Sequence, residues 1–428
     1  MQKIKIKNFG PIKDLELNIK DFMLFIGPQA SGKSTIAKTI FFFKSLKEDF
    51  IINYARLVRD GDTEDFSTIV KLKFFDIFGD SILQNSFELS FYYDDNESVF
   101  IKIKGNEKDF NLDFSDKLQD FFIDETNKLS ELKNQTSPLT SDDWSEIKEV
   151  ERQFIYNFKK KCSEILCDDR DSIFVPAGRS FYSALSDSVA YLNFKPSDFL
   201  IQSFTKKVFT LKSMFNNPME KIIQLRKSKG YDVDSEKAEY TAFLIRKILK
   251  GEYKNDISGE KIYLEDGKYV NLNFASSGQQ ESLWILLLLF IIILEQQNVF
   301  VVIEEPEAHL FPEAQKDIVA LIALLSNMKQ SQVIITTHSP YILASVNNLI
   351  MADKVGKKHF DKVSKRINKY SWLEREKVYA AFVQDGKEKE IIDKEFDIID
   401  QKYIDSVSRI INDEFDFLYE LEEGENYE

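Results

Sequence analysis

The sequence predicts an α/β fold in which a mixed sheet is flanked by helices. Short apolar segments at residues 22–26, 299–303 and 332–335 have the length and composition of buried parallel strands, and each ends in glycine or polar residues. With 428 residues, 43% hydrophobic content, 37 Phe and 17 Tyr, the chain can build a large core and is not a disordered protein. Its length suggests two or three domains.

The first of four predicted segments, residues 1–50, begins with strands and ends in a helix. Alternating apolar residues predict a strand pair within residues 4–19, interrupted by a Gly-Pro turn. The apolar strand at 22–26 follows. A helix is then expected over residues 34–44, which contain neither Gly nor Pro.

The second segment, residues 51–270, is predicted to complete the first lobe and to add a largely helical insertion. Its expected elements are a hairpin at 87–103, helices at 118–132 and 144–166, a strand at 171–176 and a hairpin around 265–267. The two helices are expected to form a short antiparallel protrusion, because no heptad pattern is long enough for a coiled-coil arm.

The third segment, residues 271–352, holds most of the motifs, and residues 353–428 form a C-terminal extension. The extension is basic at first and then acidic. A strand at 378–383 and a helix at 404–418 are expected within it.

The net charge of −14 is unevenly distributed along the chain. Residues 385–428 hold 16 acidic and 5 basic side chains, a net charge of −11, so the other 384 residues carry only −3. Bulk negative charge would repel DNA, so any nucleic-acid binding needs a local basic surface or a partner. Residues 351–370 carry seven Lys or Arg and two Asp, which favours a solvated loop, with a DNA-binding surface as the alternative.

Composition favours neither export nor a membrane partner. The longest apolar run, residues 283–294, has 12 residues, well below the roughly 20 that span a bilayer. The N-terminal residues lack the apolar core of a signal peptide. Cys162 and Cys167 match neither a zinc knuckle nor a disulfide framework. We therefore expect a reducing, cytoplasmic location.

The strongest motif is a phosphate-binding loop. Residues 27–34, Gly-Pro-Gln-Ala-Ser-Gly-Lys-Ser, match G-x-x-x-x-G-K-[ST] at every fixed position, between a predicted strand and a predicted helix. Loop N–H groups and the helix N-terminus would bind phosphate oxygens, and the glycines allow the close approach. Lys33 is predicted to reach the β- and γ-phosphates, and Ser34 to ligate Mg²⁺. The residues assigned to the nucleotide here are Gly27, Pro28, Gln29, Ala30, Ser31, Gly32, Lys33, Ser34 and Thr35.

The strand at 299–303 ends in an acidic run, Glu-Glu-Pro-Glu. A buried parallel strand delivers such carboxylates to the C-terminal edge of its sheet, where α/β proteins bind ligands. Glu304 is predicted to hold Mg²⁺, directly or through water. Glu305 is predicted to polarise the attacking water.

A histidine follows the last of the apolar strands, 332–335, in the run Thr-Thr-His-Ser. It lies one helix, 312–328, after the acidic strand. We assign His338 to sensing the γ-phosphate. His309 lies shortly after the acidic run at 304–307, and both a functional and a purely structural role remain open for it.

Residues 275–281, Ala-Ser-Ser-Gly-Gln-Gln-Glu, precede the longest apolar run. Aligned with the L-S-G-G-Q signature of ABC-type ATPases, Ser276, Gly278 and Gln279 match, while two positions depart. These three residues are assigned to the nucleotide site. N-capping of the following helix by a serine is the alternative explanation.

Taken in their order along the chain, these motifs resemble an ABC-type ATPase of the branch that holds RecF, SMC-like and OLD-family proteins. The opening IKIKNFGPIKDLELNI is similar to the N-terminal strands of that branch. EEPEAHLFP, residues 304–312, resembles its merged Walker B motif and D-loop, and TTHSPYIL, residues 336–343, its switch-histidine strand. FVPAGRS, residues 174–180, resembles ATPase subunits of bacterial anti-phage systems such as Septu and PARIS.

The resemblance implies where ATP is bound. In the family, the signature serine and glycine cap the γ-phosphate held by another protomer, so a homodimer or higher homo-oligomer forms through the ATP sites. ATP binding would close the dimer, and hydrolysis directed by Glu305 would loosen it. The expected cofactors are ATP and Mg²⁺, with Glu304 where most ABC proteins carry Asp. The glutamine of the family's Q-loop is not assigned.

The resemblance also implies a biological role. We expect an ATP-hydrolysing subunit of a bacterial anti-phage defence complex that controls a separate effector, such as a nuclease or toxin. No D-x-D pair of a TOPRIM nuclease follows His338, and H-N-H and P-D-x-K patterns are absent from the sequence. The main alternative is a RecF- or SMC-like DNA repair ATPase that binds DNA directly, and a transporter ATPase is less favoured. Arg179 is expected to be an ordinary surface residue rather than a phosphate contact.

Overall fold

The computed structural model describes residues 1–61, 64–129, 144–180 and 199–404, with isolated positions between 412 and 419. The helix expected at 404–418 therefore lies largely outside the described residues.

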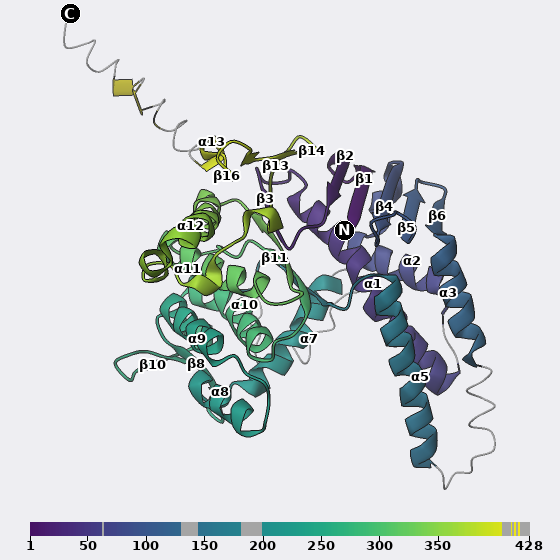
Figure 1. The fold of residues 1–428 in the computed structure, drawn as a ribbon, viewed down its shortest axis with the longest axis horizontal. Helices are drawn as coiled ribbons and strands as arrows, with labels where there is room; N and C mark the ends of the chain where they lie inside the picture. The colour runs from purple at the N-terminus through teal and green to yellow at the C-terminus, as the bar shows by residue number, and fades with distance from the viewer. Residues whose placement is uncertain are drawn as a thin grey trace, which may run out of the picture.

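A six-stranded mixed sheet occupies the centre of the molecule (Figure 1). Five of its strands are parallel, and β14 is antiparallel at one edge. In spatial order the strands are β14 (Lys387–Glu390), β13 (Val378–Gln384), β3 (Phe22–Ile26), β12 (Gln332–Thr337), β11 (Val299–Glu304) and β7 (Asp171–Val175). Every apolar strand predicted from the sequence is present, and the mixed α/β fold is confirmed.

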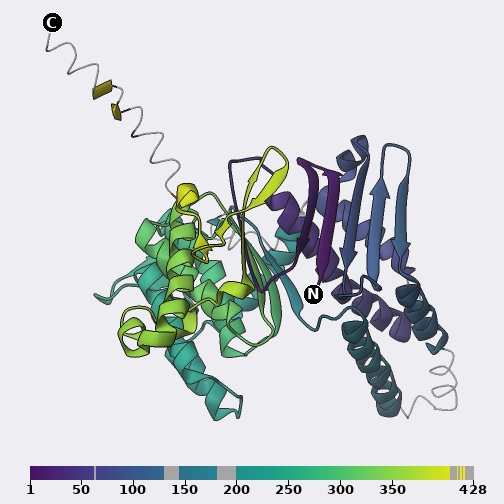
Figure 2. The same ribbon diagram turned by 45° about the horizontal axis from the view of Figure 1, so that its top comes forward.

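A second sheet is antiparallel throughout and stands beside the first (Figure 2). Its strands, in spatial order, are β2 (Ile12–Asn18), β1 (Lys3–Phe9), β4 (Phe87–Tyr92), β5 (Phe100–Gly105) and β6 (Phe110–Phe114). The predicted N-terminal strand pair and the hairpin at 87–103 are both confirmed. Because β4 pairs with β1, the start of the middle segment shares one sheet with the N-terminal segment.

Two smaller sheets and the helices complete the described fold. The small sheets are β8 (Glu252–Asp256), β9 (Gly259–Tyr263) and β10 (Tyr269–Asn271), and the pair β15 (Ile392–Asp393) and β16 (Ile398–Ile399). The α-helices are α1 (Lys33–Asp60), α2 (Phe66–Phe78), α3 (Asp116–Asn127), α5 (Trp144–Ile165), α7 (Phe199–Met214), α8 (Met219–Ser228), α9 (Ser235–Leu249), α10 (Ser277–Leu294), α11 (Pro312–Ser326), α12 (Pro340–Ser364) and α13 (Gln401–Ile404). Short 3₁₀ turns are η1 (Asp80–Gln84), η4 (Leu272–Phe274), η5 (Lys369–Ser371) and η6 (Arg375–Lys377).

The two faces of the central sheet pack into two separate cores. Side chains alternate along β3, so Phe22 and Leu24 face the core built with α7 to α12, while Met23 and Phe25 face the other. The second core joins the sheet to α1 and to the antiparallel sheet. Because the central strands are covered on both faces, they read as continuous apolar runs in the sequence.

Helix α10 lies at the centre of the first core. It is the one helix in the described part of the chain that is long and apolar enough to cross a membrane, yet 78% of that stretch is buried within the fold. Every residue from Glu281 to Leu294 is buried. A helix that is apolar all round is expected at such a position.

The basic run at 351–370 was expected to be a loop, and this expectation is wrong. Helix α12 continues through Ser364, and most of its Lys side chains are exposed. The protrusion expected near residues 118–166 is present as α3 and α5, which lie side by side (Figures 1 and 2). Lys161 of α5 donates to Glu125 of α3 at 2.9 Å.

Candidate functional site

The motif loops converge on one edge of the central sheet. In β3, Ile26 pairs with Thr337 of β12, and in β11, Glu304 pairs with Thr336. Because β3, β12, β11 and β7 are parallel, the loop that follows each strand leaves the sheet at the same edge. The predicted phosphate loop, histidine and acidic run are therefore brought together, as expected of an α/β ligand site.

Two glycines of the phosphate loop sit where no side chain fits. A Cβ on Gly27 would lie 2.1 Å from the Val383 carbonyl oxygen, and one on Gly32 would lie 2.4 Å from Ile12 Cδ1. Gly32 also has a φ of 109° and is the N-cap of α1. The loop is thus held against β13 and β2 while its backbone curls around the N-terminus of the long helix, which is a site for anions.

Lys33 is buried beneath this loop. Its Nζ donates to the carbonyl oxygens of Gly27 at 2.9 Å and Pro28 at 2.7 Å. Burial lowers the pKa of Lys33, and the carboxylates of Glu305 and Glu307 act in the opposite direction. The ammonium is therefore held where phosphate oxygens would replace loop carbonyls as its acceptors.

The remaining side chains of the phosphate loop differ in their exposure to solvent. Ser31 is buried, and its Oγ has no hydrogen-bond partner among the described residues. Ser34 is exposed and Thr35 is half-buried at the start of α1. Pro28, Gln29 and Ala30 form the exposed turn of the loop.

Glu304 and Glu305 occupy different environments although they are neighbours. Glu304 is buried; its Oε2 accepts a long hydrogen bond from Ala177 N at 3.5 Å, and its Oε1 has no partner in the described residues. Glu305 is 40% exposed and turns out of the strand with a φ of 45°. Its N–H donates to the Thr336 carbonyl at 2.8 Å, so the turn is anchored to β12.

The predicted catalytic pair meets across this edge. His338 Nε2 lies 3.1 Å from Glu305 Oε1, and both side chains reach solvent. Glu307 fixes the histidine loop from below: its Oε1 accepts from Thr337 Oγ1 at 2.5 Å and from His338 N at 3.0 Å. The sequence assigned roles to Glu305 and His338, and the structure shows that Glu307 positions one of them.

The expectation for Arg179 is wrong, because the side chain is completely buried. Its guanidinium donates to the carbonyl oxygens of Pro176 at 2.6 Å, Glu304 at 2.7 Å and Glu305 at 2.8 Å. Burial lowers the pKa of Arg179, while the surrounding carboxylates, Glu281 above all, raise it. Arg179 thus holds the backbone on which the two predicted carboxylates stand.

Arg179 also connects this backbone to helix α10. Its Nε donates to the Glu281 carbonyl at 3.1 Å, and its Nη2 lies 3.6 Å from Glu281 Oε1. The same carboxylate accepts from Arg179 N at 2.7 Å and from Ser180 N. A buried salt bridge with these additional hydrogen bonds joins the end of β7, the end of β11 and the first turns of α10.

The signature residues form the N-terminus of α10. Ser276 is the N-cap, with a capping box in which Gln279 N donates to Ser276 Oγ at 3.3 Å and Ser276 N donates to Gln279 Oε1 at 3.0 Å. Gln279 Nε2 also donates to the Leu249 carbonyl at 2.7 Å. A Cβ on Gly278 would lie 2.7 Å from the His309 carbonyl oxygen, so this glycine admits the loop that follows Glu305.

Ser276 is exposed to solvent, and the first turns of α10 contact the residues that follow β7 and β11. Strands β12 and β11 stand between β3, which leads into that loop, and β7, which is tied to α10 through Arg179. At about 4.8 Å between neighbouring strands, β3 and β7 are about 14 Å apart. Signature and phosphate loop therefore present two separate surfaces at one edge of the sheet.

Comparison with known proteins agrees with this geometry. The family described as AAA ATPase domain matches residues 1–343, which is most of the chain. The chain belongs to this family. The P-loop ATPase fold predicted from the sequence is thereby confirmed. No curated protein shows significant similarity to the chain.

Solved structures that match the chain include SMC heads. The SMC head domain from Thermotoga maritima has 12% identity and a TM-score of 0.35 over 91% of this chain and 97% of that chain. An Smc head bound to the C-winged helix domain of ScpA has 12% identity and a TM-score of 0.41 over 91% of this chain and 96% of that chain. An Smc head with an extended coiled coil bound to the C-terminal domain of ScpA, derived from Pyrococcus furiosus, has 13% identity and a TM-score of 0.39. The match covers 91% of this chain and 96% of that chain. At these TM-scores the likeness carries no inference about function.

The residues of this AAA ATPase domain fit a nucleotide with a divalent cation. Three buried oxygens near the edge, Ser31 Oγ, Glu304 Oε1 and Glu307 Oε2, have no partner among the described residues. Buried oxygens of this kind are normally satisfied, so each is a place for a ligand, a cation or a water. Hard carboxylate and hydroxyl oxygens are also the ligands that Mg²⁺ prefers.

Three residues of this site were missed by sequence reasoning. Glu281 and Arg179 interact through tertiary structure across about a hundred positions, which no local pattern reveals. Glu307 was visible as the third carboxylate of the acidic run, but its bond to the His338 loop depends on strand pairing. His309, left open, is exposed with a φ of 58°, and its carbonyl rather than its imidazole meets Gly278.

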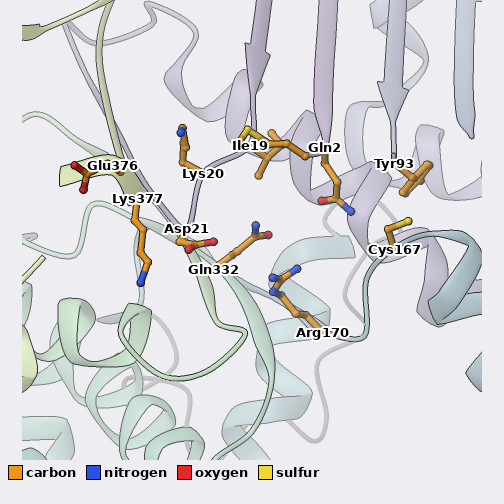
Figure 3. Close-up of a pocket in the computed structure, with 11 residues that line it drawn as sticks. Gln2, Ile19, Lys20, Asp21, Tyr93, Cys167, Arg170, Gln332, Glu376 and Lys377 are labelled. Atoms are coloured by element: carbon orange, nitrogen blue, oxygen red, sulfur yellow. The ribbon is translucent and has the colours of Figure 1, made fainter. Parts of the chain in front are cut away.

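A different cavity, of ≈ 330 Å³, lies at the opposite edge of the central sheet (Figure 3). Asp21 and Gln332, which line it, stand at the N-terminal ends of β3 and β12. Figure 3 places Arg170 beside Gln332 and Lys377 on the other side of Asp21. None of the predicted motif residues lines this cavity. It is therefore separate from the edge that holds the phosphate loop, Glu305 and His338, which we call the ATPase edge.

Proposed function

We propose that this ATPase domain hydrolyses ATP between two copies of the chain. The observation that carries the proposal is the separation of the two surfaces at one sheet edge: Ser276 and the N-terminus of α10 face solvent beside the loops after β11 and β7, while the phosphate loop follows β3, on the other side of β12. Neither surface completes the other within one chain. A second copy related by a two-fold axis would bring the signature of each chain to the loop of the other.

Each residue at this edge of the central sheet has a distinct role in the proposed reaction. The loop N–H groups, Lys33 and the N-terminus of α1 bind and orient the triphosphate. Ser34 and Glu304 would hold Mg²⁺, which supplies charge neutralisation on the phosphates when bound. Glu305, exposed and paired with His338 Nε2, is placed to accept a proton from an attacking water. Ser276 and Gly278 of the partner copy supply further donors, and Gln279 maintains the capped turn.

We further propose that the chain belongs to a bacterial anti-phage defence complex, in which ATP-driven dimerisation controls a separate effector such as a nuclease or toxin. The support is the resemblance of FVPAGRS to ATPase subunits of such systems, together with the role of its arginine in holding the catalytic backbone. The four segments 1–50, 51–270, 271–352 and 353–428 remain our proposed division of the chain, and the cytoplasm its proposed location.

A second candidate function is a RecF- or SMC-like repair ATPase that binds DNA directly. The exposed basic face of α12 favours it. Direct binding predicts ATP turnover that rises when duplex DNA is added, and an affinity that falls steeply with salt.

Mixing two inactive variants tests the shared site. Lys33→Ala removes the phosphate loop's cation and Ser276→Arg blocks the signature, so each variant alone should lack ATPase activity. In a mixed dimer one site combines an intact loop with an intact signature. Random pairing of equal amounts should therefore restore about a quarter of the wild-type rate per chain. Ser277→Arg, one residue beyond the cap, is the matched control for a bulky charge at the same turn.

Failure of the mixture to recover any activity, with both variants folded and dimeric, would show that the signature does not act in trans. The defence proposal needs a separate test, in which the chain is co-expressed with the products of its neighbouring genes. Repeated purification of the chain alone, and phage infection unaffected by Glu305→Gln, would refute control of an effector without touching the ATPase assignment.

A further inference from the structure

A basic groove with an apolar floor runs along α12, outside the ATPase edge. Its first part, ≈ 440 Å³, is lined by Met351, Val355, Val363 and other residues of the helix. Its second part, ≈ 680 Å³, lies between α9, α11 and α12. The two parts share Asn348, Arg366 and Ile367, so they form one continuous groove. The helix departs from regular geometry at His359, which lines the first part.

The charge of this groove is strongly one-sided. Its lysine, arginine and carboxylate lining residues are Lys247, Lys316, Lys362, Lys365, Arg366 and a single acid, Asp317, and His359 and Tyr240 also line it. Asp317 is already engaged by Lys247 at 2.8 Å. Within the described part of the chain, Lys316, Lys362, Lys365 and Arg366 form no ion pair within 4.0 Å. Four cations therefore surround apolar side chains, two of which, Met351 and Val355, are 38% and 37% exposed.

The C-terminal segment of the same chain has the complementary composition. Residues 405–428 contain nine Asp or Glu against one Arg, and their apolar residues recur at three- and four-residue spacing through 407, 411, 415 and 418. This pattern predicts an acidic amphipathic helix. Phe415 and Leu418 are 64% and 62% exposed, and Phe415 stacks on Tyr419 one helical turn away. Phe415 and Leu418 are thus presented to solvent.

The segment begins beside the groove. Helix α13 and strand β16, which precede it, both contact α12. Ile399 N donates to Asn347 Oδ1 at 2.9 Å, and Lys354 Nζ donates to the Phe396 carbonyl at 3.0 Å. The groove residues Asn348 and Val355 directly follow Asn347 and Lys354, and Met351 lies on the same stripe of the helix as those two residues. As a helix, 24 residues would extend about 36 Å, enough to follow the groove.

We propose that residues 405–428 dock as an amphipathic helix in this groove of their own chain. The acidic face pairs with the four unpaired cations, and the stripe through Phe415 and Leu418 covers Met351, Val355 and their neighbours. This is helix-in-groove recognition, in which apolar anchors give affinity and charges give register. The docked segment covers the most basic surface of α12, so it competes with DNA or an acidic partner for that surface.

Zero-length crosslinking of the full-length chain tests the docking. A carbodiimide joins carboxylates to lysines in direct contact, and mass spectrometry identifies the joined peptides. We expect crosslinks from residues 413–425 to Lys316, Lys362 and Lys365, and none to exposed lysines of the antiparallel sheet such as Lys104. Equal crosslinking to Lys104 would show that the segment makes no specific contact, and would overturn the proposal.

A variant that keeps every charge separates docking from general attraction. Phe415→Ser with Leu418→Ser should lower the crosslink yield about tenfold, because it removes the apolar anchors and leaves all carboxylates and lysines in place. Ile257→Ser, at a fully exposed apolar residue of the β8–β9 turn, is the matched control and should change nothing. An unchanged yield in the double variant would contradict helix-in-groove docking.

Two further outcomes identify a different occupant. Crosslinking a mixture of ¹⁴N- and ¹⁵N-labelled chains should give only same-label pairs, and mixed-label pairs would assign the groove to the segment of a second copy. Fluorescence anisotropy with a 30-base-pair duplex should show tighter DNA binding when Phe415 and Leu418 are replaced. DNA binding that is identical in wild type and double variant, without tail crosslinks, would assign the groove to DNA and overturn the proposal.

Discussion

Arg179 illustrates how much one side chain decides at this ATPase edge. Its buried guanidinium donates to the backbone carbonyls of Glu304 and Glu305 and pairs with Glu281 on the signature helix. A planar fork with several donors can serve three segments at once, whereas a lysine ammonium cannot reproduce its geometry. We therefore expect Arg179 to be a positioning residue that acts on the reaction through the two carboxylates.

Replacing Arg179 with lysine should therefore impair turnover more than nucleotide binding. We expect Arg179→Lys to lower kcat about tenfold or more, while the dissociation constant of a fluorescent ATP analogue changes less than threefold, because the phosphate loop is untouched. Steady-state ATPase assays and anisotropy give the two numbers. Arg170→Lys, at a partly exposed arginine of the opposite edge, is the control. Equal losses in binding and turnover would contradict a positioning role.

Glu305 is the residue proposed to accept a proton from the attacking water, and its replacement tests that role directly. Glu305→Gln keeps the size and the strand-end turn but removes the base, so turnover should fall at least about a hundredfold while ATP binding persists. Size-exclusion chromatography with light scattering should then show a dimer that is stable with ATP. Lys33→Ala should bind no ATP and stay dissociated under the same conditions. Normal turnover by Glu305→Gln would refute its assignment as the base.

At the scale of elements, the start of α10 and the loop after β11 form one unit. Gly278 lies against the His309 carbonyl, Ser276 caps the helix, and Glu281 holds Arg179. We therefore expect a displacement of the helix end to shift the backbone of Glu305. A partner copy that binds at Ser276 would act on the same unit, which links dimerisation to the catalytic turn.

Gly278→Ala tests this unit. The added methyl group would meet a backbone oxygen at 2.7 Å, so the helix end or the loop must shift. We expect turnover to fall about tenfold in a protein that still binds ATP, since small displacements of catalytic groups have large effects on rate. Ser277→Ala, at an exposed neighbour, should behave as wild type. A fully active Gly278→Ala variant would show that loop and helix are not coupled.

Across the whole molecule, the antiparallel sheet, α1 and the central sheet are joined by a buried polar cluster at the edge opposite the ATPase site. Lys44 of α1 donates to Asp168, just before β7, and to Gln2 Oε1 at 2.6 Å. Burial alone would raise the pKa of Asp168, but Lys44 and Arg170 outweigh it and lower that pKa below its usual value. The charged carboxylate therefore stabilises the junction of α1 and the antiparallel sheet with the central sheet.

Asp168→Asn should lower the free energy of unfolding by about 3 kcal/mol, because it leaves the Lys44 ammonium buried without its counter-ion. The lowered pKa means that the wild-type contribution is complete above the usual value of 3.8 and is lost as pH falls through the lowered one. Urea unfolding at neutral pH and below pH 4 measures both. Glu164→Gln breaks an exposed pair with Lys160 and should cost less than about 1 kcal/mol. Equal effects of the two substitutions would contradict the proposed role of the buried pair.

The central strands and the phosphate loop with Lys33 and Ser34 could be predicted from the amino-acid sequence, as could the roles proposed for Glu305 and His338. These features are local: a strand buried on both faces must be continuously apolar, and a loop that binds phosphate must hold glycines at fixed spacing. The order of motifs along the chain was enough to recognise the ATPase class, which the family match to residues 1–343 confirms.

The burial of Arg179, its partnership with Glu281 and the support that Glu307 gives to the His338 loop became visible in the folded chain alone. Each depends on which strand ends and helix ends lie next to each other. Contacts between residues 30 to 130 positions apart leave no periodicity or spacing in the sequence, because pairing of strands and packing of helices, not local propensity, bring them together.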